Sequence, residues 1–250
     1  MAKIRAVILD LGHTVWDFAP REDARRLNVL RLHQVLVAAL GEQAPAPSAL
    51  DRALGATAQR WFDSWQASDQ LEQPPSDQLV GEALDTLGIT PAADLLHQLT
   101  VIAFGAEVDV PVVEPDTLAA IARLNQRGLA LGCITNTILL EQGIADALVR
   151  LGLVRYLRSV VVSSAVGYRK PHRSLFVRAL SELEVAPREA VFVGDRLFDD
   201  ISGAKAVGMR AVLTHQYRQE PLDGASATPD AVIRRLDELP EALERLEAGR

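Results

Sequence analysis

The sequence predicts an α/β protein with a doubly wound parallel sheet and an α-helical region inserted near its N-terminus. Three observations predict this class. Short, nearly continuous apolar runs, such as Ile4 to Leu9 and Leu129 to Ile134, are typical of strands buried on both faces. Strand and helix patterns alternate after Pro115, as in parallel sheets with right-handed crossovers. Between the first strand and Pro115, the patterns are helical.

The N-terminal part predicts one strand and then four helices. Apolar residues recur at near-helical spacing over residues 21–40, and the pattern stops at Gly41. A second helix is expected from a Ser48 cap to about Trp65, and a third begins at Pro74-Pro75-Ser76. The fourth is expected to have Thr90 as its cap and Pro91 at its first position, and to reach Phe104. We expect these helices to form a separate domain over residues 19–113, here named the cap, and residues 1–18 and 114–250 to form the core.

The remaining elements of the core follow in alternation. Helices are expected over residues 116–128, 138–151, 172–183 and 199–207. Strands are expected at Leu129 to Ile134, Ser159 to Val162, Ala190 to Val193 and Ala231 to Ile233, with a terminal helix after the last.

Polar residues follow four of the predicted strands directly. These strand ends are Asp10, Thr135-Asn136, Ser163-Ser164 and Gly194-Asp195. Open α/β sheets bind ligands at the carboxyl ends of their strands, especially where the strand order reverses. We therefore expect the four ends to meet in one crevice.

The side chains at these ends have complementary chemistry. The Asp10 carboxylate can attack phosphorus, provided that a cation offsets the repulsion between the two anions. Mg²⁺ does this with oxygen ligands, which Asp195 and Asp200 supply. Lys170 adds a positive charge, and Thr135 with the backbone after it adds hydrogen-bond donors. Together they meet the requirements of phosphoryl transfer.

Four motifs resemble those of the haloacid dehalogenase superfamily, whose members are mostly Mg²⁺-dependent phosphatases. The motifs are Asp10-Leu11-Gly12-His13-Thr14, Ile134-Thr135-Asn136, Gly167-Tyr168-Arg169-Lys170-Pro171 and the stretch from Gly194-Asp195 through Asp200 to Ala204. Their order, spacing and apolar flanks match across the whole core. The resemblance implies a Rossmann-like core with an inserted cap.

The resemblance also implies roles for individual residues. Asp10 would be the nucleophile, Thr135 would bind phosphate, and Lys170 would orient both. The metal ligands would be Asp10, the Gly12 carbonyl, Asp195 and Asp200. Asn136 and His13 are further candidates for contact with the substrate.

One position departs from the usual phosphatase pattern. Many family phosphatases have a second Asp two residues after the nucleophile, where it protonates the leaving oxygen and then activates water; this chain has Gly12. General acid–base catalysis contributes about 10²–10⁴-fold. We therefore expect slow turnover, a good leaving group or a substitute acid. His13 is either that acid or a turn residue whose ring packs outward, and the sequence leaves both interpretations open.

Gly12 and other residues make some alternative activities less favoured than others. Phosphomutases depend on the missing acid, and phosphonate hydrolases need a cap lysine, whereas the lysines here are Lys3, Lys170 and Lys205. A 2-haloacid dehalogenase is less favoured because both Asp195 and Asp200 are retained. A non-catalytic protein that binds a phosphate ligand stays open as the alternative from another class.

Composition is that of an ordinary globular protein, with 24% charged and 48% apolar residues. The net charge of −7 disfavours a general nucleic-acid or anionic-membrane surface. Cys133 is the lone cysteine, and the N-terminal apolar run is too short for a secretory leader. We expect a cytoplasmic monomer or homodimer that acts on a small phosphorylated metabolite.

The cap contains an aromatic cluster of Trp61, Phe62 and Trp65. Trp61 and Trp65 lie on one helix face, which favours a seam between cap and core over direct contact with the substrate. Trp16 and Asp17 follow the first motif directly, and we expect Asp17 to be a local hydrogen-bond partner.

Overall fold

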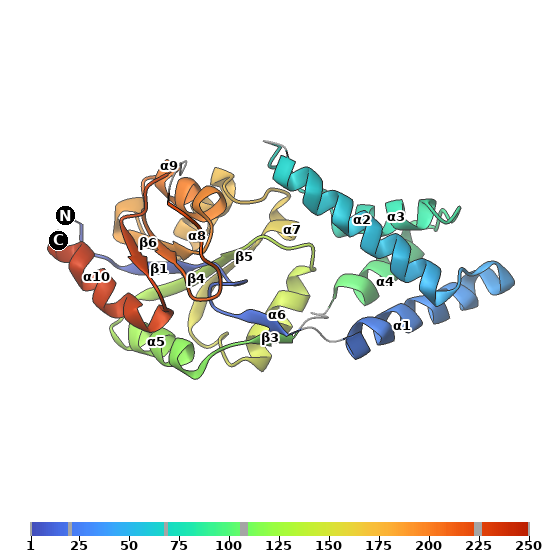
Figure 1. Ribbon diagram of the computed structural model, residues 1–250, viewed down its shortest axis with the longest axis horizontal. Helices are drawn as coiled ribbons and strands as arrows, with labels where there is room; N and C mark the ends of the chain where they lie inside the picture. The colour runs from blue at the N-terminus through green and yellow to red at the C-terminus, as the bar shows by residue number, and fades with distance from the viewer. Residues whose placement is uncertain (1, 20–21, 68–69, 106–109, 223–226, 250) are drawn as a thin grey trace.

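The computed structural model describes residues 2–19, 22–67, 70–105, 110–222 and 227–249. Its centre is a six-stranded parallel sheet in the order β5-β4-β1-β6-β7-β8 (Figure 1). The strands are β1 (Ala6–Leu9), β4 (Ala130–Thr135), β5 (Leu157–Val162), β6 (Ala190–Gly194), β7 (Arg210–Thr214) and β8 (Ala231–Ile233). The predicted fold class is confirmed.

Helices cover both faces of this sheet. Successive strand residues point to opposite faces, so Val7 and Leu9 of β1 join one apolar cluster while Ala6 and Ile8 join another. The first cluster includes side chains of α5 (Pro115–Gln126), α6 (Glu141–Arg150), η4 (Leu236–Glu238) and α10 (Leu239–Ala248). The second includes α8 (Arg173–Glu182), η3 (Leu197–Ser202) and α9 (Gly203–Ala206). The short α7 (Ser163–Val166) follows β5, and η2 (Pro187–Glu189) precedes β6.

Two core segments differ from the sequence expectation. Strand β7 was not predicted, because its apolar run is only three residues long and follows the half-buried Arg210. The helix expected over residues 199–207 is instead a π-helix, η3, which begins at Leu197, followed by α9. Periodicity does not separate a π-helical turn from an α-helix over so few residues.

The segment expected to form the cap contains α1 (Glu22–Leu40), η1 (Gly41–Gln43), α2 (Pro47–Ala67), α3 (Ser76–Asp85) and α4 (Ala93–Phe104). These helices surround an apolar cluster of their own, with Leu32, Leu36 and Leu99 at its centre. They lie at the opposite end of the molecule from both termini (Figure 1). Two short antiparallel strands, β2 (Asp17–Ala19) and β3 (Val110–Val112), pair at the base of the cap.

Two predicted helix starts in the cap were wrong by one to three residues. Ser48 lies inside the first turn of α2, which begins at Pro47. Helix α4 begins at Ala93 after the extended Ala92, so Thr90 and Pro91 lie outside it. Local capping preference specifies such ends only weakly, because packing shifts them by a residue or two. In the described segments, the structure contains no helix with the length and apolarity needed to cross a bilayer.

Candidate active site

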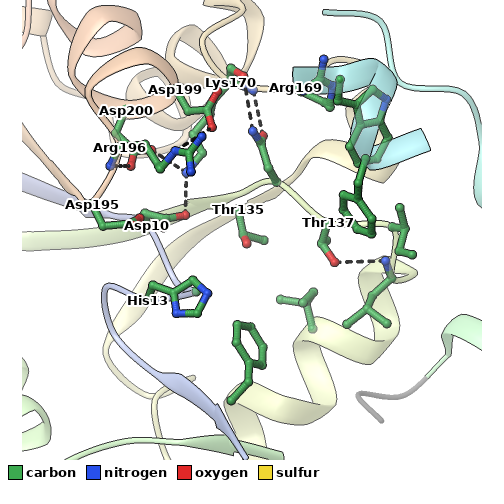
Figure 2. A pocket seen from close by; sticks show the side chains of 18 of the residues that line it. Asp10, His13, Thr135, Thr137, Arg169, Lys170, Asp195, Arg196, Asp199 and Asp200 are labelled. Atoms are coloured by element: carbon green, nitrogen blue, oxygen red, sulfur yellow. Dashed lines mark hydrogen bonds and ion pairs between the residues drawn. The ribbon is translucent and has the colours of Figure 1, made fainter. Parts of the chain in front are cut away.

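The carboxyl ends of three adjacent strands line a cavity of about 930 Å³ (Figure 2). β1 lies between β4 and β6, where the strand order reverses. Asp10 follows β1, Thr135 ends β4 and Asp195 follows β6, and all three side chains are buried. The predicted crevice therefore lies at the topological switch point of the sheet.

Lys170 enters this cavity from the segment between α7 and α8. Its Nζ donates a hydrogen bond of 2.5 Å to Asp10 Oδ1 and one of 3.2 Å to the carbonyl oxygen of Ile134. It also lies 2.7 Å from Asp200 Oδ1 in an ion pair. Burial by itself lowers the pKa of Lys170, but the charges and hydrogen bonds of Asp10 and Asp200 outweigh burial and raise it above its ordinary value. The ammonium therefore stays charged.

Three buried carboxylates meet beside this single buried lysine. Oxygen atoms of Asp10, Asp195 and Asp200 lie within 4.8 Å of one another. Burial, with the charges of Asp10 and Asp200, raises the pKa of Asp195 to about 8. Burial also raises the pKa of Asp200 to about 7, although Lys170 opposes the shift. The cluster therefore has more negative charge than the lysine balances.

The turn after β6 explains how Asp195 and Asp200 reach the same place. Asp200 lies in η3, and its Oδ2 accepts a hydrogen bond of 2.9 Å from the backbone nitrogen of Arg196. A Cβ at Gly194 would collide with the Asp200 carboxylate, so this position requires glycine. Thr14, from the turn after β1, donates a 3.5 Å hydrogen bond from Oγ1 to Asp195 Oδ1.

The donor set of this cluster fits a hard divalent cation. Asp195 Oδ2 and Asp200 Oδ1 are buried, and each faces a cationic side chain in an ion pair, Lys170 in the case of Asp200. The partner of Asp195 Oδ2 is Arg218, whose guanidinium nitrogen lies 3.0 Å away. Three carboxylates that gather within 4.8 Å with more negative charge than their cationic neighbours balance offer the hard oxygen ligands that Mg²⁺ prefers.

Asn136 supports Lys170 from the end of β4. Its Oδ1 accepts a 2.8 Å hydrogen bond from the Lys170 backbone nitrogen, and its Nδ2 donates one of 3.3 Å to the Lys170 carbonyl (Figure 2). The side chain predicted to contact substrate therefore also fixes the position of the lysine.

The fourth predicted strand end, Ser163-Ser164, supports a loop of the site and does not line the cavity. Ser163 Oγ accepts a 2.9 Å hydrogen bond from the backbone nitrogen of Thr137, and Ser164 Oγ donates to the carbonyl oxygen of Leu139. Neither serine is among the described residues that line the cavity. They hold the loop after β4, which does line it.

The cap is bonded to the loop after β4, which lines the cavity. Gln73 Nε2 donates to the Thr137 carbonyl, and Ser76 Oγ donates to the Ile138 carbonyl, each at 2.7 Å. The Leu140 backbone nitrogen donates to the Phe104 carbonyl at 2.9 Å. These three bonds attach the cap to the loop after β4.

The aromatic cluster of the cap divides between two places. Trp61 is buried within the cap and donates from Nε1 to Glu82 at 2.9 Å. Trp65 lies at the seam, where the Arg169 guanidinium is 4.7 Å from its ring centroid, and it lines the cavity beside Phe62. Trp65 therefore both packs between cap and core and lines the cavity.

A family model described as haloacid dehalogenase-like hydrolase matches residues 4–208, most of the chain. The chain belongs to this family.

Its relatives include both phosphatases and dehalogenases. Glyceraldehyde 3-phosphate phosphatase of Methanopyrus kandleri is 34% identical over 53% of this chain. The match covers only 57% of that relative's length. Phosphoserine phosphatase of Thermus thermophilus is 34% identical over 68% of this chain and 66% of its own. The crystal structure of a 2-haloacid dehalogenase from Pseudomonas syringae pv. Tomato superposes with a TM-score of 0.66 at 26% identity, over 97% of this chain and 99% of that one.

Within this haloacid dehalogenase-like site, Gly12 lies against Phe18. A Cβ at Gly12 would lie 3.2 Å from a ring carbon of Phe18, so the ring would have to shift slightly to admit a side chain there. His13 adopts a left-handed backbone conformation with φ of 56°, and its Nδ1 lies 3.0 Å from Asp17 Oδ1. Its ring lines the cavity, edge-on to Phe18. Asp17 is thus the local hydrogen-bond partner that its position predicted.

Sequence reasoning missed Phe18 and Arg218 as parts of this site. Phe18 was placed only at a hinge, and Arg218 lies in a polar loop without a recognisable motif. No local sequence pattern links either residue to the site.

Proposed function

We propose that this chain is a Mg²⁺-dependent hydrolase of phosphomonoesters that works through an aspartyl-phosphate intermediate. The observation that supports it is the convergence of Asp10, Lys170, Asp195 and Asp200 at one strand edge, with the Lys170 Nζ 2.5 Å from Asp10 Oδ1. The named phosphatases among its relatives agree with this proposal.

The residues of the core take distinct roles in this proposal. Asp10 attacks phosphorus with the oxygen that does not bond Lys170. Lys170 holds the nucleophile in place and neutralises a phosphoryl oxygen, and Thr135 donates a hydrogen bond to another. Asn136 and Ser163 act indirectly, because they position Lys170 and the loop after β4.

Asp10, Asp195, Asp200 and the Gly12 carbonyl would hold Mg²⁺, which supplies positive charge to the transferring phosphoryl group when bound. Residues 19–113 would form the cap and the rest of the chain the core. The cap excludes water while the phosphoryl group moves.

The proposal is tested by Asp10→Asn, which keeps the shape of the side chain and removes the nucleophile. Phosphate release from p-nitrophenyl phosphate with Mg²⁺ should fall by at least about 10³-fold. Undiminished release would reject Asp10 as the nucleophile. Far-UV circular dichroism and the thermal midpoint verify that the variant folds.

Dehalogenation is the second candidate, because a 2-haloacid dehalogenase superposes over nearly the whole chain. In that reaction, Asp10 would attack carbon and displace a halide. Halide release from 2-chloropropionate, measured beside phosphate release, separates the two activities. Phosphate release without halide release favours the phosphatase. If neither product forms and inorganic phosphate still binds, the chain is a binding protein.

A further inference from the structure

The cap presents an apolar surface to the cavity. Among the described residues, those of the cap that line the cavity are Phe62, Trp65, Ala103 and Phe104. Two cap arginines are engaged elsewhere: Arg25 pairs with Asp51 at 2.8 Å, and Arg60 donates to Thr57 at 2.9 Å. A leaving group that enters this side of the cavity therefore meets side chains of hydrocarbon character.

Aromatic rings stand at this side of the cavity with much of their surface uncovered. Phe62 of the cap is 41% exposed, and Phe198 of the core is 46% exposed. The Phe62 ring lies edge-on to Trp65, with ring centroids 5.2 Å apart. Single exposed apolar residues are common, but two phenyl rings that line one cavity form a surface for an apolar ligand.

The core continues this apolar surface next to the phosphoryl end. Ile138, Leu139 and Ile144 line the cavity beyond Thr135, and Phe18 lines it beside Gly12. Two of the three core arginines that line the cavity are in close contact with protein groups, and the third, Arg196, has an ion pair of 3.9 Å with Asp199. Arg218 pairs with Asp195, and Arg169 stacks on Trp65 and donates to the Gln70 carbonyl at 2.8 Å.

The absence of a carboxylic acid at Gly12 restricts the leaving group independently, through the acidity that its oxygen must have. Gly12 has no side chain that could deliver a proton, and the Phe18 ring lies 3.2 Å from the Cβ that any other residue would add there. An oxygen that departs without this proton must be stable as an anion. A phenol has a pKa of about 10, well below that of an alcohol, so a phenolate leaves more readily than an alkoxide.

From these two independent observations, and resting on the proposed function, we propose that the substrate class is aryl phosphates, with Phe62 and Trp65 as specificity-determining residues. Asp10 forms the bond to phosphorus while the bond to the aryl oxygen breaks. The electron pair goes to that oxygen, which leaves as a phenolate and takes a proton from water. Water then cleaves the aspartyl phosphate, which releases inorganic phosphate and restores the Asp10 carboxylate.

The test compares four substrates with the full-length protein and Mg²⁺. 1-Naphthyl phosphate has an aromatic leaving group, acetyl phosphate has a small acidic one, and β-glycerophosphate and phosphoserine have polar alcohols. We expect kcat/KM for 1-naphthyl phosphate to exceed that for each alkyl ester by at least about 10-fold. We expect kcat/KM for 1-naphthyl phosphate to exceed that for acetyl phosphate as well, because 1-naphthyl phosphate should have the lower KM.

Variants of the exposed Phe62 separate ring contact from leaving-group acidity. Phe62→Ala should lower kcat/KM for 1-naphthyl phosphate roughly 3- to 10-fold through KM, as the loss of one aromatic contact predicts. It should change kcat/KM for acetyl phosphate by less than about 2-fold, and Phe62→Leu should lie between. Leu27→Ala, at an exposed apolar residue of α1 that does not line the cavity, is the matched control.

Two outcomes would overturn the aryl assignment and leave the phosphatase proposal standing. One is hydrolysis of phosphoserine or β-glycerophosphate at least as efficiently as 1-naphthyl phosphate. The other is an equal loss for every substrate in Phe62→Ala. Absence of phosphate release from all four substrates would overturn both proposals.

Discussion

The core and the cap line one cavity with opposite chemistry. The core side contains three buried carboxylates within 4.8 Å of one another and a buried ammonium that pairs with two of them. The cap side consists, in the described residues, of three aromatic side chains and an alanine. Charged groups can be buried only with specific partners, so they need fixed residue types at fixed places, whereas an apolar wall requires only shape.

This difference explains why the activity is easier to infer than the substrate. Substituting Lys170 or Asp195 would leave a buried charge without its partner. Such positions therefore accept few residue types, and this restriction makes the motifs around them recognisable in a sequence. Many combinations of apolar residues can form the wall around Phe62 and Trp65. Under our two proposals, the core carries out the reaction and the cap selects the leaving group.

The largest effect is expected for Lys170→Met, which keeps an unbranched side chain of nearly the same length and removes the buried charge. The unfolding free energy should fall by about 3–5 kcal/mol, because Asp10 and Asp200 lose their buried partner. Phosphate release should fall by at least about 10²-fold. Urea denaturation and the phosphatase assay measure the two losses.

Lys205→Met is the control, since Lys205 pairs with Asp230 at the surface. That pair should contribute no more than about 1 kcal/mol. Equal losses in the two variants would contradict the contrast between a buried and an exposed lysine.

The next effect is expected in the cap. Leu36 is fully buried in the apolar cluster of the cap, so Leu36→Ala should cost about 2–5 kcal/mol. If the cap unfolds as a unit of its own, amide hydrogen exchange should accelerate in α1 to α4 and stay slow in β1 and β4. Leu131→Ala, at an equally buried core residue, should accelerate exchange in the core. Uniform acceleration by both variants would show that the two regions unfold together.

Mg²⁺ should stabilise the core by a smaller amount. At 100 times its dissociation constant, it should contribute about 2.7 kcal/mol, which corresponds to roughly 5 to 10 °C in thermal midpoint. Asp195→Asn should largely remove this shift. An unchanged shift in that variant would place the cation elsewhere.

The magnesium effect should depend on pH. The raised pKa values of about 8 for Asp195 and about 7 for Asp200 mean that the metal-free folded state binds protons that the unfolded state has already lost. Stability without metal should therefore fall as pH rises from about 5 to 8, and the Mg²⁺ shift should grow over the same window. Differential scanning fluorimetry with and without EDTA measures both trends.

The smallest effect is expected for Gly12→Asp. A restored acid should raise turnover of alkyl phosphates, but the Phe18 ring must move, since it lies 3.2 Å from the new Cβ. We expect a gain of less than about 10-fold, well below the range of about 10²–10⁴-fold that a well-placed acid provides. Gly12→Asp combined with Phe18→Leu should gain more. A fall in turnover in both variants would mean that another group already supplies the proton.

The sequence by itself predicted the fold class, most strands and the residues that gather around Asp10. Buried parallel strands need continuous apolar runs, and each run ends where the chain meets solvent or ligand. Neighbouring residues in the sequence therefore indicate both the strand and the polar group at its end. Because carboxyl ends of parallel strands share one edge, Asp10, Thr135 and Asp195 could be placed together without coordinates. Helix starts such as those of α2 and α4 were off by a few residues because local capping signals are weak.

Tertiary packing alone decided the surroundings of these residues. Phe18 against Gly12, Arg218 on Asp195, and Trp65 under Arg169 are contacts between side chains that no local pattern links. Their partners are chosen by the space and charge that remain once the sheet and cap have packed, and these depend on the whole chain at once. The chemistry of the core is therefore legible in the sequence, whereas the shape that selects its substrate exists only in the folded protein.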